Sequence, residues 1–378
     1  MKIYDVIIIG GGLSGSSTAL HLSNKGYSVL IIEKNDKQNI SACAGGMASS
    51  MSDFLPLNIT EAIESKVNNV QFTWKSSDLV NANLSGESPF WIVKREKFDQ
   101  LLLNKAIKQG TEIITGITVE KIEKGKNIWF ITSDNFNIYK SKFLVIADGS
   151  NSIWPEYFGL GPKRPKYANT ISLRLNELGD IPKYSVRFEF GLVKYGFAWA
   201  FPMEQSVNIG IGTFIGNKEI IKKELVQKVV KSFGFSEQTF EYKKHALRIW
   251  NGNNSLNSDG ILVVGDAASL CDPFLAEGIR PSLLSSFYAA ESIDKCFALN
   301  NTNLDNYSNA IRLKWGNSMI WGKRIAEVFY RFPRTGYQLG VKRKTAPKRI
   351  AQILSGKMTY GDIAGRVIKR LLFQKTLD

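Results

Sequence analysis

The segment "DVIIIGGGLSGSSTALHLSNKGYSVLIIEK" (residues 5–34) contains the pattern that decides the fold. Its apolar, β-branched start at residues 6–9 is typical of a strand that is buried on both faces of a parallel sheet. A Gly10-x-Gly12-x-x-Gly15 turn follows at once, and then come a helix-like stretch and a second apolar strand that ends in Glu33. Strand, glycine turn, helix, strand and acid in this order predict a nucleotide-binding βαβ unit.

The parts of this unit have separate roles toward a bound nucleotide. The glycines allow a tight turn and a close backbone approach to a pyrophosphate, while the helix N-terminus offers free N–H groups and a partial positive charge. Glu33 lies eighteen residues after Gly15, a suitable place for a carboxylate that accepts hydrogen bonds from an adenosine ribose. The residues expected to contact the nucleotide are Gly10, Gly12, Leu13, Ser14, Gly15, Glu33 and Lys34.

The length and composition argue against several other classes of protein. A chain of 378 residues is long enough for two or three domains. The sequence contains no run of about 18 apolar residues, so we predict no membrane-spanning helix. The first strand begins too early to leave room for a cleavable signal peptide. Three cysteines without a CxxC pair and two histidines support neither a disulfide framework nor a metal site. A reducing cytoplasm is the expected location.

Positive charge is concentrated near the C-terminus. The chain carries a formal net charge of +15, and residues 331–375 hold twelve Lys and Arg against one acid, Asp362. We find no nucleic-acid-binding motif there, and so we expect no nucleic-acid partner. Residues 363–372 place apolar and basic side chains on opposite sides of a helix, a pattern typical of peripheral contact with an anionic membrane. A solvated basic face whose apolar side packs on the protein explains the pattern equally well.

The order of the expected elements indicates a discontinuous nucleotide-binding domain. Apolar strands at 143–147 and 260–264 return to the nucleotide-binding sheet on either side of a strand-rich stretch. We therefore predict an α/β chain with a Rossmann-like nucleotide-binding domain, an inserted β-rich substrate domain and a basic helical C-terminal region. The predicted ranges are 1–50, 92–160 and 246–300 for the first, 51–91 and 161–245 for the second, and 301–378 for the third.

Two further motifs stand at characteristic distances from the glycine turn. "ADGSNS" (147–152) follows an apolar strand, and "GDAASLCDPFLAEGI" (265–279) follows another. Together with "RxxFD" (95–99), they resemble the FAD-dependent oxidoreductases of the p-hydroxybenzoate hydroxylase fold. The resemblance implies that the nucleotide is FAD, that Asp266 binds the ribityl chain, and that the turn at 277–279 opens a helix toward the flavin. The further cofactor-binding residues that it implies are Arg95, Asp148, Gly149, Gly265, Asp266, Pro273, Gly278 and Ile279.

Three shorter segments narrow this resemblance. "CAGG" (43–46) follows the second strand, and "FAWAFP" (197–202) precedes "VNIGIG" (207–212). These segments resemble the geranylgeranyl reductase family, and the resemblance covers residues 1 to about 300. It implies cofactor contacts from Cys43, Ala44 and Gly45, substrate contacts from Phe197, Trp199 and Phe201, and catalytic roles for Cys43 and Trp199.

Three positions depart from that family: Phe197, Met203, which stands where a lysine is common, and Ala44, which stands where a glycine is common. Phe197 stands where a tyrosine is usual, which removes a candidate acid. Tyr195, two residues earlier, would lie on the same face of the strand because side chains alternate with a period of two. We therefore expect Tyr195 to be the substitute catalytic residue.

The implied activity is a reduction. Members of the family add a hydride equivalent from reduced FAD, together with a proton, across isolated double bonds of a prenyl chain. One dinucleotide fingerprint is present, so NAD(P)H would bind transiently or a ferredoxin-like protein would donate the electrons. The alternatives are an FAD-dependent monooxygenase of the same fold and a membrane-docked flavoprotein that does not turn over lipid. The flavin motifs end near residue 280, and so we expect a chain that is cut after Ser355 to keep its FAD spectrum.

Overall fold

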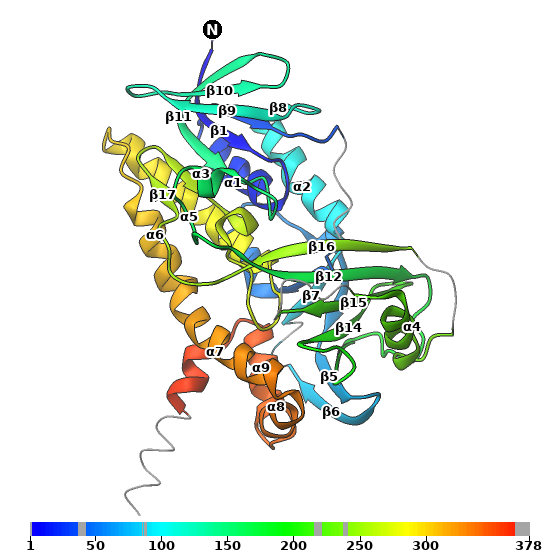
Figure 1. Cartoon of the computed structure of the whole chain (residues 1–378). Helices are drawn as coiled ribbons and strands as arrows, with labels where there is room; N and C mark the ends of the chain where they lie inside the picture. Colours follow the sequence, from blue (N-terminus) through cyan, green and yellow to red (C-terminus); the bar gives the residue numbers. More distant parts are fainter. Residues whose placement is uncertain are drawn as a thin grey trace, which may run out of the picture.

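Two sheets of different kinds are stacked along the long axis of the molecule in Figure 1, and C-terminal helices run beside both. The computed structural model describes residues 2–36, 43–84, 86, 89–214, 221–236 and 241–366. The first sheet contains the expected βαβ unit, and the second lies next to it as a broad, mainly antiparallel layer.

The first sheet has eight strands in the described residues. Five of them are parallel and lie in the order β18 (Ile261–Val263), β11 (Ile138–Ile146), β1 (Ile3–Ile9), β2 (Val29–Ile32) and β8 (Glu112–Ile114). Antiparallel strands β17 (Asn257–Ser258), β10 (Trp129–Ser133) and β9 (Val119–Lys124) complete it. Residues 6–9 of β1 are at most 5 % exposed, as expected for a strand that is covered on both faces.

Helix α1 (Leu13–Asn24) lies directly on this sheet because two glycines permit the approach. A Cβ atom at Gly15 would lie 1.9 Å from the carbonyl oxygen of Gly10. Gly10 has φ +100°, and a Cβ atom there would lie 2.5 Å from the carbonyl oxygen of Ala147, which follows β11. Helices α2 (Arg95–Lys108) and α5 (Ile279–Ala298) pack against α1. The amino end of α1 is thereby fixed at the carboxyl edge of the parallel strands.

The second sheet has seven strands in the described part of the chain, and it draws on distant segments. Its order is β16 (Tyr242–Ile249), β12 (Lys166–Leu175), β15 (Val207–Thr213), β14 (Gly196–Pro202), β13 (Ser185–Phe190), β5 (Asn69–Trp74) and β6 (Ser77–Asn83). Helix α4 (Lys223–Ser232) covers one face. A small sheet of β3 (Gly46–Ala48), β7 (Phe90–Val93) and β4 (Ile63–Val67) lies near the junction of the two large ones.

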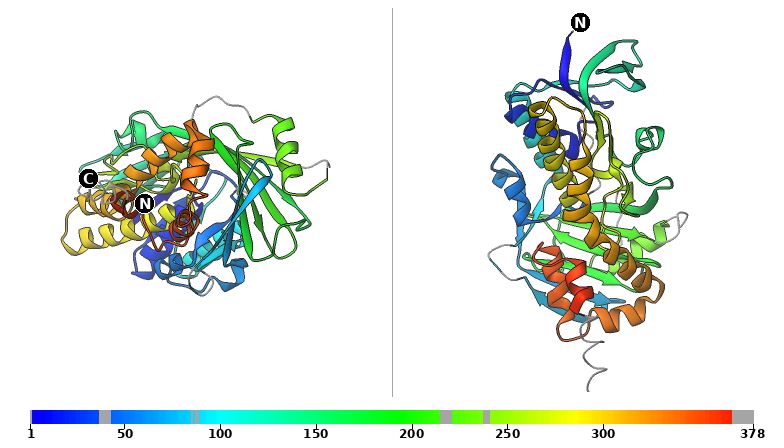
Figure 2. Two further views of the ribbon diagram at one scale, coloured as in Figure 1. Left: turned by 90° about the horizontal axis from the view of Figure 1, so that it is seen from below. Right: turned by 90° about the vertical axis from the view of Figure 1, so that its left-hand side faces the viewer.

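The C-terminal helices follow one another along the side of the molecule (Figure 2). They are α6 (Asp305–Ile311), the π-helical turn η4 (Arg312–Gly316), α7 (Asn317–Arg331), α8 (Pro333–Gly340) and α9 (Ala346–Leu354). The buried hydroxyl of Tyr307 donates to the carbonyl oxygen of Val263 in β18, and α9 packs against β6. The short helical turns elsewhere are η1 (Ser49–Phe54), η2 (Thr60–Ala62), α3 (Trp154–Tyr157) and η3 (Gly265–Ala268).

The predicted fold class is confirmed: the chain is α/β, with a Rossmann-like sheet, a β-rich part and C-terminal helices. The predicted division into domains stays a proposal, which the membership of the two large sheets supports. The small sheet joins the two proposed domains. Its strand β3 lies in the range 1–50, and the paired strand β7 spans the boundary between residues 91 and 92. Among the described helices, we find none that combines the length and the apolar character needed to cross a membrane.

The close approach of α1 to β1 gives a direct test of the fold. Replacing Gly15 by Ala should lower the free energy of unfolding by about 1–3 kcal/mol, because the added methyl group meets the Gly10 carbonyl oxygen. Gly12→Ala is the matched control, since nothing lies within 4 Å of a Cβ atom at Gly12. Urea unfolding without added FAD measures both variants. A Gly15→Ala protein as stable as the wild type would contradict the packing described here.

Candidate functional site

A cavity of about 1340 Å³ extends from the carboxyl ends of β1, β2 and β11 to one face of the seven-stranded sheet. Ligand pockets commonly have volumes of roughly 300–1,000 Å³, so this cavity has room for a dinucleotide and a second ligand together. The predicted site residues that line it are Gly10, Gly12, Leu13, Ser14, Glu33, Lys34, Cys43, Ala44, Arg95, Asp148, Gly149, Phe197, Trp199, Phe201, Asp266, Gly278 and Ile279.

One end of the cavity combines a carboxylate with the glycine turn. Glu33 Oε2 accepts a hydrogen bond from the backbone N–H of Gly11 at 2.7 Å. Glu33 Oε1 accepts two more from Asn35, at 3.0 Å from the backbone N–H and at 2.6 Å from the side-chain amide. These bonds hold the carboxylate beside the amino end of α1. Gly12 leaves open space there, so an anionic group can approach the free N–H groups of the helix.

Asp148 adds a second acid to this end of the cavity. Its Oδ1 atom is buried and has no hydrogen-bond partner among the described residues. Burial raises the pKa of the carboxyl to about 6. A buried carboxylate oxygen without a partner costs free energy that a donating ligand removes. The glycine turn, Glu33 and Asp148 therefore fit the pyrophosphate and the hydroxyl groups of FAD.

Cys43 lies on the cavity wall beside a guanidinium group. Arg95 forms a two-bond ion pair with Asp99, from Nε to Oδ1 at 2.9 Å and from a terminal nitrogen to Oδ2 at 2.8 Å. The backbone N–H of Gly45 donates to Cys43 Sγ at 3.4 Å. Burial lowers the pKa of Arg95, but Asp99 and Cys43 more than offset this effect and raise the pKa above its usual value. Arg95 is therefore a permanent cation next to the Cys43 thiol.

The other end of the cavity has an aromatic wall. Along β14, Phe197, Trp199 and Phe201 line the cavity, whereas Ala198 and Ala200 belong to the apolar cluster under α4 on the opposite face. This alternation follows from the two-residue period of a strand, and the small alanines leave room for the helix. The strand is fully buried on both faces, so its aromatic side is available to a ligand only through the cavity.

The aromatic wall is held rigidly. The indole Nε1 of Trp199 donates to Asn208 Oδ1 at 3.1 Å. The indole ring also packs onto the backbone of Gly210, where an added Cβ atom would lie 1.9 Å from it. Phe201 contacts Phe188 and Phe90 edge-on, with ring centroids 5.6 and 6.3 Å apart. A ligand in this part of the cavity would therefore contact apolar ring surface and little water.

The turn before α5 bounds the cavity on a further side. Asp266, Gly278 and Ile279 line it there, and Asp266 Oδ2 lies 3.9 Å from His245 Nε2. Glu277 also lines the cavity, although the sequence motifs did not indicate its side chain as a site residue. The pattern that could have identified it is an acid in an apolar turn with Arg280 three residues later, because a buried acid needs a nearby cation.

Four predicted site residues lie next to the cavity wall but do not line the cavity. A Cβ atom at Gly15, Gly45 or Gly265 would lie 1.9–2.0 Å from a neighbouring atom, so these glycines permit close packing and do not line the cavity. Pro273 is buried in the loop between η3 and α5 and does not line the cavity either.

The geometric basis for choosing Tyr195 is wrong. Tyr195 precedes β14 and has φ +55°, so the alternation of side chains along the strand does not extend to it. Its ring lies 4.9 Å from the ammonium nitrogen of Lys194 and does not line the cavity. The structure therefore gives no support for a catalytic role of Tyr195.

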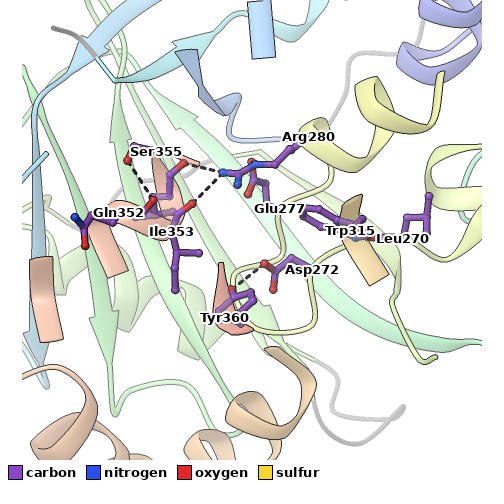
Figure 3. Close-up of polar contacts among 10 residues, drawn as sticks. Leu270, Asp272, Glu277, Arg280, Trp315, Gln352, Ile353, Ser355 and Tyr360 are labelled. Carbon is purple, nitrogen blue, oxygen red and sulfur yellow. Dashed lines mark hydrogen bonds and ion pairs between the residues drawn. The ribbon is translucent and has the colours of Figure 1, made fainter. Parts of the chain in front are cut away.

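The C-terminal region contacts the loop that carries the flavin motif at residues 265–279. The Tyr360 hydroxyl is buried and donates to Asp272 Oδ2 at 2.8 Å, in the loop before α5. Trp315 Nε1 donates to the carbonyl oxygen of Leu270 in the same loop, also at 2.8 Å. Figure 3 shows these C-terminal side chains around the loop. The sequence could not reveal these contacts, because their partners lie up to 88 residues apart.

Comparisons with known proteins agree with this geometry. Residues 5–88 match the family described as FAD dependent oxidoreductase. An uncharacterized protein of Methanosarcina barkeri is 27% identical over 334 residues, which are 88% of this chain and 84% of that protein. The digeranylgeranylglycerophospholipid reductase of Methanococcus vannielii is 24% identical over 323 residues, which are 82% of each chain.

Solved structures show the same fold. A geranylgeranyl bacteriochlorophyll reductase-like protein from Thermoplasma acidophilum superimposes with a TM-score of 0.79 at 21% identity, over 95% of this chain and 93% of that one. Flavin-dependent halogenases share the fold as well. The resemblance to FAD-dependent oxidoreductases and to geranylgeranyl reductases is therefore confirmed, and so is FAD as the cofactor.

The contacts of Glu33 lead to a prediction for cofactor affinity. Glu33→Ala should weaken FAD binding by about 1.5–3 kcal/mol, because the ribose hydroxyls lose a charged acceptor. Glu120→Ala, an exposed acid on β9, is the control and should bind FAD as the wild type does. Fluorescence titration of FAD into the apoprotein measures both. An unchanged dissociation constant for Glu33→Ala would mean that the ribose is held elsewhere.

Proposed function

We propose that this FAD-dependent oxidoreductase, a relative of the geranylgeranyl reductases, saturates isolated double bonds of a geranylgeranyl or related prenyl chain on a lipid, a pigment or a diphosphate. The observation that carries the proposal is the aromatic end of the cavity, where Phe197, Trp199 and Phe201 line the wall together with Phe90 and Phe188. The name of the Methanococcus vannielii relative supports a prenyl lipid as substrate.

The side chains on the cavity wall divide the work in this proposal. Bound FAD supplies the hydride equivalent. Glu33, Arg95, Asp148 and Asp266 bind and orient the cofactor, while the aromatic wall holds the prenyl chain and excludes water from it. Cys43 and Trp199 lie on the wall where cofactor and substrate would meet, and we assign to them the alignment of the double bond.

The electrons come from outside the chain. The sequence contains one dinucleotide fingerprint, which FAD uses. A transiently bound NAD(P)H or a ferredoxin-like protein would therefore reduce the flavin. The halogenase neighbours mean that the fold does not select the reaction. In this proposal the aromatic wall selects the substrate, because an unactivated alkene needs an apolar binding site.

Contact with an anionic membrane is proposed for the α7–α8 surface, which comprises Val328, Arg331, Phe332, Arg334 and Leu339. The three apolar side chains are 52–65 % exposed. Val328 and Arg331 lie three residues apart on the exposed side of α7, and the exposed Phe332 directly follows the last residue of that helix. Apolar side chains flanked by cations match a lipid surface with anionic headgroups.

The predicted helix at 363–372 contributes less to this proposal. Residues from 367 onward lie outside the described part of the chain. Ile363 is partly buried against the core. This contact favours the interpretation in which the apolar side of the predicted helix packs on the protein.

The reductase proposal predicts separate effects on turnover and on flavin content. Trp199→Ala and Cys43→Ala should lower hydrogenation of a digeranylgeranylglycerophospholipid roughly tenfold or more, because the double bond is no longer aligned, while FAD content stays near that of the wild type. Trp74→Ala, which replaces a partly buried tryptophan outside the cavity, is the control.

Mass spectrometry after anaerobic reduction of the holoenzyme counts the hydrogens added to the lipid. Full turnover by both Trp199→Ala and Cys43→Ala would contradict the assigned placement. Incorporation of oxygen in place of hydrogen would show the reaction to be that of a monooxygenase.

The membrane proposal predicts binding that salt weakens. Replacing Arg331 and Arg334 by Glu should weaken binding to phosphatidylserine vesicles at least about tenfold, since each basic residue contributes on the order of 1 kcal/mol. Replacing Val328 and Phe332 by Ser should weaken it at all salt concentrations. Phe136→Ser is the control, because Phe136 is 85 % exposed on the hairpin at the other end of the molecule. Vesicle co-sedimentation that is equal for all variants would overturn the assignment of this surface.

A further inference from the structure

The turn at residues 276–278 brings one carboxyl group to the flavin side of the cavity. Glu277 is 9% exposed, and its side chain lines the cavity. Its Oε1 atom accepts a hydrogen bond from Arg280 Nε at 2.9 Å. Among the described residues, its Oε2 atom accepts none, so one oxygen is tied to a cation and the other is available to the cavity.

Arg280 connects this carboxyl group to the C-terminal segment, which we define as residues 346–366. A terminal nitrogen of Arg280 donates to the carbonyl oxygens of Ile353 and Leu354, at 3.1 and 2.9 Å (Figure 3). The guanidinium is therefore fixed on both sides, by Glu277 and by two backbone carbonyls at the end of α9. If the ion pair between Arg280 and Glu277 served only to stabilise the turn, Glu277 would not need to line the ligand cavity. Its position there suggests a role toward the ligand.

The rest of the loop is fixed in the same way. Asp272 Oδ1 accepts hydrogen bonds from the backbone N–H groups of Phe274 and Leu275, at 2.7 and 3.0 Å. Its other carboxylate oxygen accepts the hydroxyl of Tyr360 at 2.8 Å. The contacts of Asp272 fix the start of the loop, and those of Arg280 fix its end. Glu277 is therefore held in one place relative to the amino end of α5.

The surroundings of Glu277 set its proton affinity. Burial raises the pKa of Glu277 to about 7, Arg280 opposes this, and Asp272 adds to it. Further titratable groups near Glu277 include Cys271 in the same loop, Tyr360 beyond α9, and Asp266, whose Oδ1 atom would lie 3.7 Å from a Cβ atom at the adjacent Gly278. A reduced flavin brings negative charge into the cavity, and a like charge nearby disfavours the carboxylate form. Reduction of the cofactor should therefore drive a proton onto this carboxyl group.

We propose that Glu277 is the proton-exchanging group of the site and that Arg280 is a positioning residue that ties it to the C-terminal segment. When the external donor delivers a hydride equivalent to FAD, as a hydride or as two electrons with one proton from solvent, the Glu277 carboxylate takes a further proton from solvent. The fate of that proton rests on the proposed function: as a prenyl double bond accepts the hydride equivalent, the O–H bond of Glu277 breaks and its proton supplies the second hydrogen. The carboxylate is then restored.

Infrared difference spectroscopy on the substrate-free holoenzyme tests this proposal. At neutral pH, the reduced-minus-oxidised spectrum of the wild type should contain a carboxylic-acid C=O band, and Glu277→Gln should abolish it. Glu189→Gln is the matched control and should retain the band. Glu189 is a buried acid on β13, away from the cavity, that accepts hydrogen bonds from Thr73 and from the backbone N–H of Ser76. A wild-type band that persists in Glu277→Gln would overturn the proposal, and so would the absence of any band in the wild type.

Two further measurements separate a proton-exchanging role from a structural one. In the wild type, the band should disappear as the pH falls about two units below the pKa of Glu277, since the carboxyl group is then protonated before reduction. A band of constant size would overturn the proposal.

The second measurement uses variants of Arg280. Arg280→Lys should keep the band. Arg280→Met should lose it, because an unpaired buried carboxyl group is protonated in both redox states; retention of the band in Arg280→Met would contradict the positioning role. Failure of prenyl hydrogenation with this band intact would refute the proposed function alone.

Discussion

The approach of Gly15 to the carbonyl oxygen of Gly10 is the constraint on which the rest of the site depends. With no side chains at these positions, α1 lies on β1, and its amino end faces the cavity. The loop after β11 also meets Gly10 closely, which places Asp148 on the cavity wall. The nucleotide end is therefore built largely from backbone, and a few acids suffice to complete it.

Three separate parts of the chain converge on the cavity. The parallel sheet supplies the nucleotide end, the seven-stranded sheet supplies the aromatic wall, and the loop before α5 supplies an acidic turn. The C-terminal helices fix that loop through Trp315 and Tyr360. The region that we propose to contact lipid is thus continuous with the region that positions the flavin side of the cavity. Along the chain, α7 and α8 directly precede α9, whose last two carbonyl oxygens hold the Arg280 guanidinium that pairs with Glu277.

The sequence predicted the features that depend on neighbours in the chain. The βαβ unit follows from local periodicity and from the spacing of its glycines and Glu33, and the structure has it. The aromatic residues of β14 that line the cavity were implied by the resemblance to geranylgeranyl reductases. The features that the sequence did not predict correctly lie where local periodicity ends or where long-range contacts decide the structure. Tyr195 leaves the strand pattern because its backbone turns at φ +55°. The contacts of Arg280 with Leu354 and of Tyr360 with Asp272 join segments 74 and 88 residues apart, which no local pattern encodes.

The central claim is that one cavity holds FAD along the glycine turn and leaves the aromatic wall free for a prenyl chain. A crystal structure of the protein with FAD tests it most directly. We predict that the adenosine lies against Glu33 and that the isoalloxazine lies between Cys43 and the turn at 276–278, with open volume remaining beside Phe197 and Trp199. An isoalloxazine that fills the aromatic end, or one bound outside this cavity, would contradict the account.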